Sequence, residues 1–296
     1  MTESLRRDAR RSPRQLSSLR QALGPKSGVL TSIFELLCRF PVLKRLIWRR
    51  WYQFLARRFD IPEWQTMNYG YCALPVPESL ALDPSEQSER YGLQLYHATT
   101  SGHSLQDKEV LEVGCGRGGG AAFLHRIGMP KSMTGVDFSA QAIALCQARY
   151  QRERLRFVVG DAEKLPFPDA SFDFVVNVES SHCYGSIPAF LSEVRRVLKP
   201  GGRFACADFR DADKIANWRA QMVSSGLRIV AEREITANVL AALDADNDRK
   251  LMLMQKHLPK SLYGLFSDFA AVKGSLVYET FRKREMQYYL FELEKD

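Results

Sequence analysis

The sequence has few cysteines, and none of them are paired closely. It contains six among 296 residues, namely Cys38, Cys72, Cys115, Cys146, Cys183 and Cys206. No two of them form a Cys-x-x-Cys motif, which argues against a zinc ribbon or a redox dithiol. Scattered free thiols are typical of proteins in a reducing compartment, so we expect a cytoplasmic protein.

The N-terminal part lacks the long apolar run of a membrane-spanning helix or a secretory signal. Residues 1–27 are rich in Arg and Ser and have little apolar periodicity, which predicts a flexible basic arm. No small-residue cleavage site follows an apolar run there, although the composition leaves a transit peptide open. A membrane span needs about 20 mostly apolar residues, and six Lys or Arg side chains interrupt residues 44–58.

Residues 28–59 have apolar side chains at helical spacing, and Pro41 divides them into two predicted helices. Two interpretations stay open. The segment forms a lid helix packed on the main domain, or a basic amphipathic helix on an anionic membrane surface with Trp48 and Trp51 at the interface. Ser88–Thr100 also reads as helical, so we predict an N-terminal helical lid over residues 28–100.

The body of the chain lacks excess positive charge. The net charge of +8 is concentrated in residues 1–60, which hold 14 Lys or Arg and 4 Asp or Glu. Residues 61–296 hold the remaining 28 and 30, a net charge of −2. A nucleic-acid partner normally requires a basic patch on the folded domain, so we expect none.

From residue 109 onward, short β-branched runs alternate with helical patterns. The expected strands are Glu109–Val113, Ser132–Asp137, Arg156–Val159, Phe172–Val178, Arg203–Asp208, Leu227–Glu234 and Gln287–Glu294. The expected helices are Gly119–Ile127, Ala140–Gln151 and Ala189–Leu198, the last followed by a turn at 199–202, and a helical insertion covers about 236–275. This alternation predicts an α/β fold with a mostly parallel sheet and helices on both faces.

A glycine-rich turn follows the first expected strand. Gly114, Gly116 and Gly119 satisfy the Gly-x-Gly-x-x-Gly pattern, and Asp137 follows Gly114 by 23 residues, as at a dinucleotide site. Glu112, two residues before the first glycine, argues against a dinucleotide ligand. Its carboxylate would repel a pyrophosphate but attract an ammonium group. S-adenosyl-L-methionine (SAM) carries an ammonium group and no phosphate.

Acidic residues end three successive strands, where open α/β sheets bind their ligands. Glu112 would hold the amino group of SAM or order water around it. Asp137 would accept from both ribose hydroxyls, with Phe138 against the adenine. Asp161 would accept from the adenine amine, and the Ala162 backbone would address the ring edge. The complete set expected to bind SAM from the domain is Glu112, Gly114, Gly116, Gly118, Asp137, Phe138, Asp161, Ala162 and Asn177.

The ordered motifs at 112–118, 135–139, 160–167 and 195–202 resemble those of class I SAM-dependent methyltransferases. That resemblance implies a Rossmann-like, seven-stranded domain over residues 101–296 with S-adenosyl-L-homocysteine (SAH) as product. Further stretches at 48–58, 67–71, 177–184 and 207–218 resemble the phthiotriol/phenolphthiotriol dimycocerosate methyltransferases, which O-methylate a hydroxyl on a long-chain lipid.

By the closer resemblance, Asn68 and Tyr71 would fold over the cofactor from the N-terminal side. Nucleic-acid amino-methyltransferases carry an Asp/Asn-Pro-Pro-aromatic tetrad after the fourth strand. Residues 177–180 hold no proline, which again argues against a nucleic-acid substrate.

One histidine follows the fourth strand, where the acceptor should lie. Of the five histidines, only His182 occupies this position, and Asp208 ends the neighbouring fifth strand. Adjacent strands lie about 5 Å apart, so the two side chains are within reach of each other. His182 would take the hydroxyl proton, and Asp208 would orient the imidazole. Related sugar O-methyltransferases are thought to use this pair. Asp211 and Asp213 suggest a solvated loop, and we expect no metal.

We therefore expect an O-methyltransferase acting on a hydroxyl of a lipophilic small molecule, as a monomer or homodimer. Apolar side chains at 240–258 and 262–272 suit a lipophilic ligand, and equally an ordinary core. Two alternatives stay open. One is a fatty-acid or other carboxyl methyltransferase, which needs no base. The other is a non-catalytic, membrane-associated SAM-binding protein.

Overall fold

The computed structural model describes residues 61, 63–75 and 80–296. The predicted basic arm and residues 28–60 of the predicted lid lie outside the described residues, as do the two membrane or lid helices expected there. Within the described part, the expected helix near residue 88 is α4 (Arg90–Thr100), which follows a short 3₁₀ turn at Pro84–Glu89.

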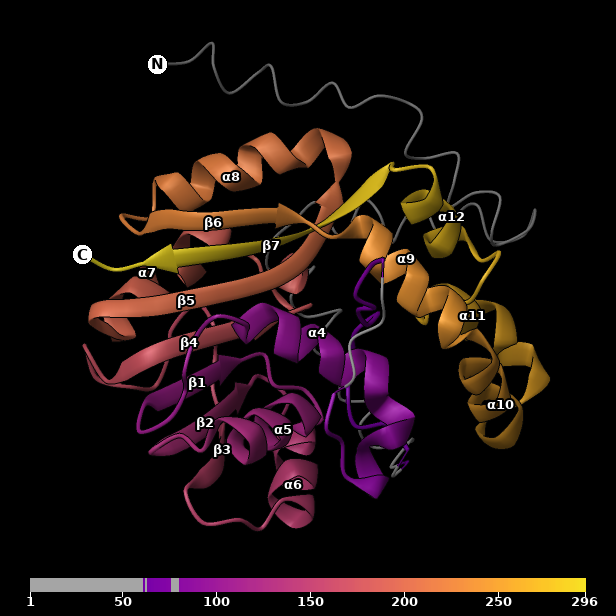
Figure 1. Cartoon of the computed structure of the whole chain (residues 1–296), viewed down its shortest axis with the longest axis horizontal. Helices are drawn as coiled ribbons and strands as arrows, with labels where there is room; N and C mark the ends of the chain where they lie inside the picture. The colour runs from indigo at the N-terminus through magenta and orange to yellow at the C-terminus, as the bar shows by residue number, and fades with distance from the viewer. Residues whose placement is uncertain (1–60, 62, 76–79) are drawn as a thin grey trace.

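A seven-stranded mixed sheet forms the centre of the molecule (Figure 1). Its strands in chain order are β1 (Glu109–Val113), β2 (Ser132–Asp137), β3 (Leu155–Val159), β4 (Phe172–Val178), β5 (Leu198–Asp211), β6 (Arg228–Glu234) and β7 (Met286–Glu294). In space their order is β3-β2-β1-β4-β5-β7-β6. The first five strands are parallel, and β7 is antiparallel to both β5 and β6. The seven-stranded architecture predicted from the sequence is confirmed.

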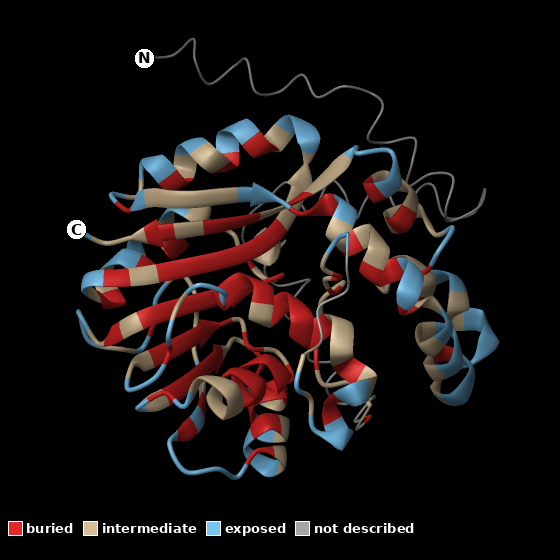
Figure 2. Ribbon diagram, viewed as in Figure 1, coloured by how far each residue is buried: buried red, intermediate tan, exposed pale blue. Residues whose placement is uncertain are grey.

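Helices cover both faces of this sheet, and the strands between them are almost entirely buried (Figure 2). Alternate residues of β5 supply the two cores. Ala205 and Ala207 face the side covered by α4, α5 (Gly119–Gly128), α6 (Ala140–Arg149), α9 (Thr236–Ala245) and α12 (Leu276–Arg282). Phe204 and Cys206 face the side covered by α7 (Ile187–Val197) and α8 (Ile215–Val223). Near-continuous apolar runs are what a doubly covered strand requires.

Several expected boundaries were wrong. Strand β5 continues past Asp208 to Asp211, and helix α6 ends at Arg149 instead of Gln151. Helix α7 begins at Ile187, not Ala189, because the Ser186 hydroxyl caps it by accepting from the Ala189 N–H at 3.2 Å. The turn expected at residues 199–202 is part of β5, which begins at Leu198 and pairs there with Phe172. A shift of register between Phe172 and Phe174, together with the positive φ of 73° at Gly201, lets the chain bulge while it stays paired.

The helical insertion before the last strand is larger than expected and reaches residue 282. It comprises α9, α10 (Asn247–His257), α11 (Tyr263–Phe269) and α12, and we call residues 236–282 the cap. Its outer helices α10 and α11 form a small core of their own, in which Met254, Phe266 and Val272 pack with Ile61. In the part of the chain that the structure describes, no helix combines the length and apolarity needed to cross a membrane.

Candidate active site

The glycine-rich loop connects β1 to α5 and forms the floor of the main pocket. Gly114, Gly116 and Gly118 have φ angles of 76°, 52° and 78°, a region that favours glycine. The loop is pinned to β2, since the N–H groups of Gly114 and Cys115 donate to the Val136 carbonyl at 2.8 and 3.1 Å. A Cβ on Gly114 would lie 2.3 Å from the Ser180 Oγ, so the close approach of these two elements depends on glycine.

Asp137 at the end of β2 organises this loop from the opposite side. Its Oδ2 accepts from the Gly116 N–H at 2.9 Å, and its Oδ1 accepts from the Ser139 N–H at 2.8 Å. Burial raises the pKa of Asp137, while the backbone hydrogen bonds from Ser139 and Gly116 act in the opposite direction. A carboxylate oxygen has two lone pairs and can accept a second hydrogen bond, so Asp137 keeps acceptor capacity toward the pocket.

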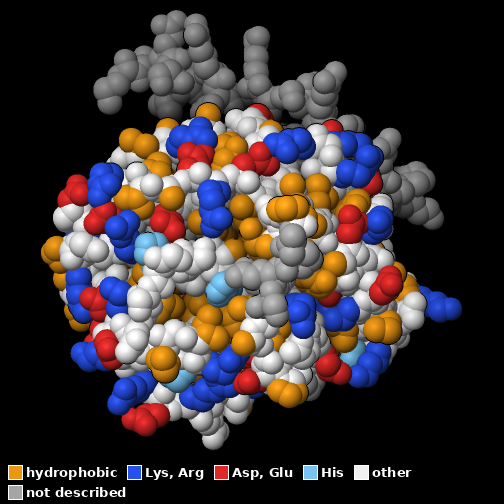
Figure 3. Space-filling model, viewed as in Figure 1, with side chains coloured by type: hydrophobic (Ala, Val, Ile, Leu, Met, Phe, Trp, Pro, Cys, Tyr) orange, Lys and Arg blue, Asp and Glu red, His pale blue; other side chains and the backbone are white. Residues whose placement is uncertain are grey.

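The pocket beside this loop occupies about 1140 Å³, including the space at its open mouth. Six of the residues expected to bind the cofactor line it, namely Gly114, Gly116, Asp137, Phe138, Asp161 and Ala162. Three residues from the N-terminal side also line it, namely Gln65, Thr66 and Met67. On the face shown in Figure 3, hydrophobic side chains gather near the middle, and Lys, Arg, Asp and Glu lie mostly toward the rim.

Glu112 lies behind the pocket wall and is fully buried. Its Oε1 accepts from the Tyr96 hydroxyl at 2.7 Å, and Tyr96 itself lines the pocket. Its Oε2 has no hydrogen-bond partner among the described residues. Burial raises the pKa of Glu112 to about 7, against the opposing effect of the Tyr96 hydrogen bond. A buried carboxylate oxygen that lacks a partner is suited to a cationic group of a ligand.

Four other expected cofactor residues also lie outside the pocket lining. Asn177 is fully buried, and its Nδ2 donates to the Val113 carbonyl at 2.9 Å, to Ser180 Oγ at 2.7 Å and to Tyr184 Oη at 3.0 Å. It therefore braces three lining residues instead of lining the pocket itself. A Cβ on Gly118 would lie 2.8 Å from the Cys146 sulfur, so this glycine faces the core.

Asn68 and Tyr71 are likewise set back from the pocket. Asn68 closes a local turn by accepting from the Gly70 N–H at 3.0 Å and donating to the Gly92 carbonyl at 3.3 Å. The Tyr71 N–H donates to the Tyr91 carbonyl at 2.9 Å, and its ring packs on the core. The segment expected to cover the cofactor is thus at the pocket, but residues 65–67 line it. No individual role was expected for residues 65–67, because Gln, Thr and Met side chains at these positions form no recognisable binding motif.

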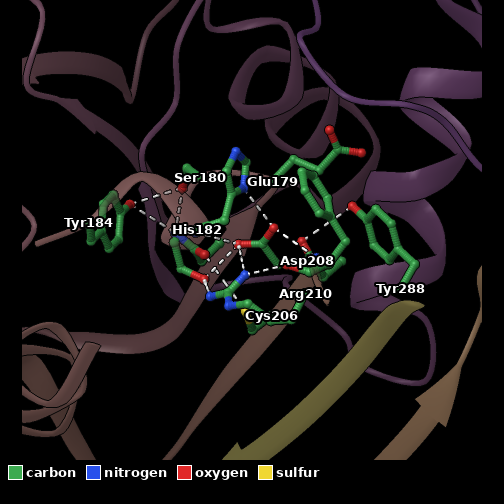
Figure 4. A network of polar contacts seen from close by, with 12 residues as sticks. Glu179, Ser180, His182, Tyr184, Cys206, Asp208, Arg210 and Tyr288 are labelled. Carbon is green, nitrogen blue, oxygen red and sulfur yellow. Dashed lines mark hydrogen bonds and ion pairs between the residues drawn. The ribbon is translucent and has the colours of Figure 1, made fainter. Parts of the chain in front are cut away.

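His182 and Asp208 meet where β4 and β5 end (Figure 4). Nδ1 of His182 lies 2.8 Å from Oδ1 of Asp208, and the Asp208 side chain is fully buried. The His182 backbone N–H also donates to Oδ2 of Asp208 at 2.9 Å. Both the ring and the backbone of His182 are therefore fixed by one carboxylate. The imidazole keeps 18% of its side-chain surface exposed, whereas the Asp208 side chain is fully buried.

Two more side chains complete the binding of the Asp208 carboxylate. The Ser181 hydroxyl donates to Oδ2 at 2.6 Å, and Nη1 of Arg210 lies 3.2 Å from the same oxygen. The Arg210 guanidinium lies 4.2 Å from the centre of the Trp218 ring, which fixes its position. Neither Ser181 nor Arg210 was singled out in the sequence. Ser181 reaches Asp208 from the 3₁₀ turn after β4, and Arg210 reaches it from the end of β5.

The pair carries strongly perturbed pKa values. Burial would raise the pKa of Asp208, but the charges of His182 and Arg210 outweigh it and hold the pKa below its usual range. Burial would lower the pKa of His182. The neighbouring Cys183 sulfur and the Asp208 carboxylate outweigh that effect and raise the pKa above 6.5. The surroundings of the pair thus favour imidazolium and carboxylate, with Arg210 beside the same carboxylate.

Glu179 is a pocket-lining carboxylate whose orientation the sequence left undecided. It follows β4 with a φ of 44°, which is uncommon for a residue with a side chain. Its Oε1 accepts from the Tyr69 N–H at 2.6 Å, and burial raises its pKa to about 8. Glu179 therefore joins the N-terminal segment to the rim of the pocket.

An aromatic wall stands beside His182. The rings of His182 and Phe209 have centroids 4.4 Å apart, and Phe209 contacts Tyr69 and Phe281 with centroids 5.5 and 5.6 Å away.

Among residues 61, 63–75 and 80–296, no three His, Cys, Asp or Glu side chains gather closely enough to hold a metal ion.

The pocket suits SAM. Its floor is a glycine turn at a helix N-terminus. Glu112 is the last residue but one of β1, Asp137 ends β2, and Asp161 follows β3 on the pocket wall. The unpartnered buried oxygen of Glu112 matches an ammonium group, and a pyrophosphate would meet two nearby carboxylates. The residues present therefore fit SAM better than a dinucleotide.

Comparison with known proteins gave one matching protein family and many relatives. Residues 111–206 match the family described as a methyltransferase domain. The chain is 39% identical over 250 residues to the phthiotriol/phenolphthiotriol dimycocerosates methyltransferase of Mycobacterium leprae, covering 84% of this chain and 92% of the relative. It is 36% identical over 240 residues to a fatty-acid O-methyltransferase of Mycolicibacterium smegmatis, covering 81% of this chain and 86% of the relative.

Solved structures share the fold at low sequence identity. The geranyl diphosphate C-methyltransferase of Streptomyces coelicolor, solved with SAH, matches with a TM-score of 0.60 and 18% identity, covering 83% of this chain and 98% of that one. The [4+2]-cyclase SpnF matches with a TM-score of 0.62 and 18% identity, covering 83% of this chain and 94% of that one. At this identity, these neighbours support the fold alone.

Proposed function

We propose that this chain, which belongs to the phthiotriol/phenolphthiotriol dimycocerosates methyltransferase family and is a SAM-dependent methyltransferase, methylates a hydroxyl oxygen of a lipophilic acceptor. The products are a methyl ether and SAH. The observation that carries this proposal is the 2.8 Å contact between His182 and the buried Asp208.

That contact is compatible with a general base, because a carboxylate beside Nδ1 favours the tautomer that carries its proton there. When Nδ1–H of His182 donates to Asp208, Nε2 is the ring nitrogen that carries the lone pair and can accept a proton. Methylation of a hydroxyl oxygen requires that its proton leave, and Nε2 receives it. The resulting imidazolium is stabilised by the Asp208 carboxylate, which its hydrogen bonds with Ser181 and the His182 N–H keep in place.

The raised pKa of His182 is compatible with this role. A second positive charge entering the pocket disfavours the imidazolium, because like charges near each other oppose ionisation. His182 would then release its proton to solvent before the acceptor binds. Arg210 acts in the same direction, since it neutralises part of the Asp208 charge that holds the imidazolium.

We assign the cofactor to the pocket beside the glycine-rich loop. SAM supplies an electrophilic methyl group on a positively charged sulfur, which leaves as the neutral thioether of SAH. The backbone of Gly114 and Gly116 allows close approach, and Asp137 offers acceptors for ribose hydroxyls. Phe138, Asp161 and Ala162 line the side where we place the adenine, and Glu112 attracts the amino group directly or through Tyr96.

The lipophilic character of the acceptor rests on two kinds of support. The relative from Mycobacterium leprae is named for dimycocerosates, and the Mycolicibacterium relative is named for fatty acids. In this chain, Phe209 packs beside His182 and Tyr69 packs beside Phe209, and neither of these two rings belongs to a fully buried residue, so they offer apolar surface to a hydrocarbon chain.

The test uses methyl-labelled SAM, the full chain and a total lipid extract of the host. We expect label in the organic phase that survives mild alkaline hydrolysis, because ethers are stable to alkali. Alkali-labile label would identify a methyl ester and refute the ether. Label confined to the aqueous phase would refute the lipophilic acceptor.

Methylation of a carboxyl group is the second candidate, favoured by the 36% identity to a fatty-acid O-methyltransferase. A carboxylate is already ionised near neutral pH and needs no base. The two candidates therefore differ in their dependence on His182. A His182→Gln variant that esterifies fatty acids at an undiminished rate would support the carboxyl candidate.

A further inference from the structure

The segment that covers the cofactor pocket is held by the cap as well as by the methyltransferase domain. We call residues 63–71 the strap. Its residues Gln65, Thr66 and Met67 line the pocket. On the domain side, the Gly119 N–H donates to the Gln65 carbonyl at 3.2 Å, and a Cβ on Gly119 would lie 2.5 Å from that oxygen.

Glu89 is the buried carboxylate beneath the strap. Its side chain is 1% exposed, and its Oε2 accepts from the backbone N–H of Thr66 at 2.7 Å and from the Thr66 hydroxyl. Its Oε1 accepts from Nη1 of Arg249 at 3.0 Å. One carboxylate therefore joins a pocket-lining residue of the strap to helix α10 of the cap.

Arg249 is itself fixed in place by the cap. Its Nε and Nη2 form a two-pronged contact with the Asp246 carboxylate, at 2.6 and 2.7 Å. Its remaining amino group lies between Glu89 and the Glu63 carbonyl, the latter at 3.3 Å. A planar guanidinium held at both ends transmits position better than a flexible ammonium. A shift of α10 would therefore move residues 63 and 66 together.

The cap also contacts the chain at and beyond the two ends of the strap. Lys256 of α10 pairs with the Glu63 carboxylate at 2.9 Å, and this pair is largely exposed. Asn238 of α9 exchanges two hydrogen bonds with Cys72, at 3.1 and 2.9 Å. The strap between them reaches the catalytic rim through the Tyr69 N–H and Glu179.

We propose that Glu89 and Arg249 are positioning residues through which the cap sets the affinity of the cofactor pocket. The cap closes the strap over the cofactor when α10 is in its place, and a cap displaced by the acceptor loosens it. Only the involvement of the acceptor rests on the proposed function. The link between the cap and cofactor affinity is independent of which atom is methylated.

The test measures the dissociation constant of SAH by calorimetry on the full chain. Arg249→Met removes both contacts to the strap side, and we expect SAH binding to weaken about 10-fold, a typical coupling between two sites. The matched control is Arg219→Met, which breaks the Arg219–Glu232 pair between α8 and β6, away from the pocket. We expect this control to bind SAH within about twofold of the unmodified chain.

A second pair of variants separates positioning from a general loss of structure. Thr66→Val removes the hydroxyl donor to Glu89, whereas Thr66→Ser keeps it. We expect weaker SAH binding for Thr66→Val and near-normal binding for Thr66→Ser. If Arg249 and Thr66 both act through Glu89, their effects are not additive. The double variant Arg249→Met with Thr66→Val should then have about the same affinity for SAH as the single variant that binds SAH less tightly.

Three outcomes would overturn the proposal. They are unchanged SAH affinity in Arg249→Met, an equal loss in the Arg219→Met control, and full additivity of the two single losses. If Arg249→Met does not fold, the Thr66→Val and Thr66→Ser comparison decides alone. SAH binding needs neither acceptor nor methyl transfer, so failure of the O-methylation proposal would leave these results intact.

Discussion

Asp208 and Phe209 are consecutive residues of β5, and both hold the His182 ring. Asp208 accepts from the ring edge at 2.8 Å, and the Phe209 ring packs on its face with centroids 4.4 Å apart. Neighbouring side chains of a strand point to opposite faces, so His182 lies across the end of the strand. The imidazole is thus oriented in two directions by one dipeptide, which leaves little freedom to its Nε2.

Replacing His182 should separate catalysis from cofactor binding. His182→Gln removes the base, and we expect the rate of hydroxyl methylation to fall about 100-fold or more. The SAH dissociation constant should change little, because His182 does not line the cofactor pocket. Single-turnover transfer of labelled methyl and calorimetry on the same preparation would measure both. A variant that keeps its rate with hydroxyl acceptors would rule out the general-base role.

The ion pair should also stabilise the fold over a limited pH range. The pKa of His182 is raised above 6.5, so its contribution is complete below pH 6.5 and is lost as the pH rises through the raised value. The pKa of Asp208 is lowered below 3.8, so its contribution is present above pH 3.8 and is lost as the pH falls.

We therefore expect the difference in unfolding free energy between the unmodified chain and His182→Gln to be largest between about pH 4 and 6.5. Urea unfolding at a series of pH values would measure it. Lys131→Gln, which removes an exposed pair with Glu109, is the control and should show no such maximum. A difference that is independent of pH would contradict the shifted values.

Substitution of Glu112 should weaken binding without weakening the fold. Glu112→Gln keeps the shape but removes a buried carboxylate whose Oε2 has no partner among the described residues. We expect the melting temperature to stay the same or rise, because the desolvation cost disappears. SAH binding should weaken about 10-fold, since the negative charge that attracts the ammonium group from behind Tyr96 is lost.

The pH dependence gives an independent check on Glu112. Burial raises its pKa to about 7, so SAH affinity should fall as the pH drops below 7 and the carboxylate is protonated. In Glu112→Gln this fall should be absent. Glu109→Gln, at the other end of β1, should behave like the unmodified chain. An identical pH profile in all three proteins would exclude a charge effect at residue 112.

Gly114 tests the shape of the loop. Gly114→Ala places a methyl group 2.3 Å from the Ser180 Oγ at a φ of 76°, so either the loop or the end of β4 must move. We expect loss of measurable SAH binding together with lower thermal stability. Gly102→Ala has a similar φ of 86° but open space around it, and it should retain binding. Normal SAH affinity in Gly114→Ala would mean that the loop is not the cofactor cradle.

Much of the fold could be predicted because the strands are short, apolar and separated by glycine or acidic residues. The β5 boundary could not, since Lys199–Gly202 has the composition of a turn and stays in the sheet only through pairing with residues far away. Pairing between distant segments is not encoded in local composition.

Site residues could be predicted where a side chain of suitable chemistry lies at or just after the carboxyl end of a strand. Asp137 ends β2, His182 lies in the short turn after β4, and both carry side chains suited to their expected roles. Asn177 and Asn68 have suitable side chains, but these side chains form hydrogen bonds with neighbouring backbone and hydroxyl groups. Gln65 and Thr66 reach the pocket only because Glu89 and the Gly119 N–H hold them there, which no local pattern reveals.

The place of β7 between β5 and β6 also bears on how the protein is made. The ribosome delivers β5 and β6 first, and both must wait for Met286–Glu294 before either gains its antiparallel neighbour. During that interval each strand presents an unpaired edge to the cell, the kind of surface that recruits other chains. Nascent protein stalled within the cap should therefore depend on chaperones, whereas the cofactor half, β1 to β4, can already be paired.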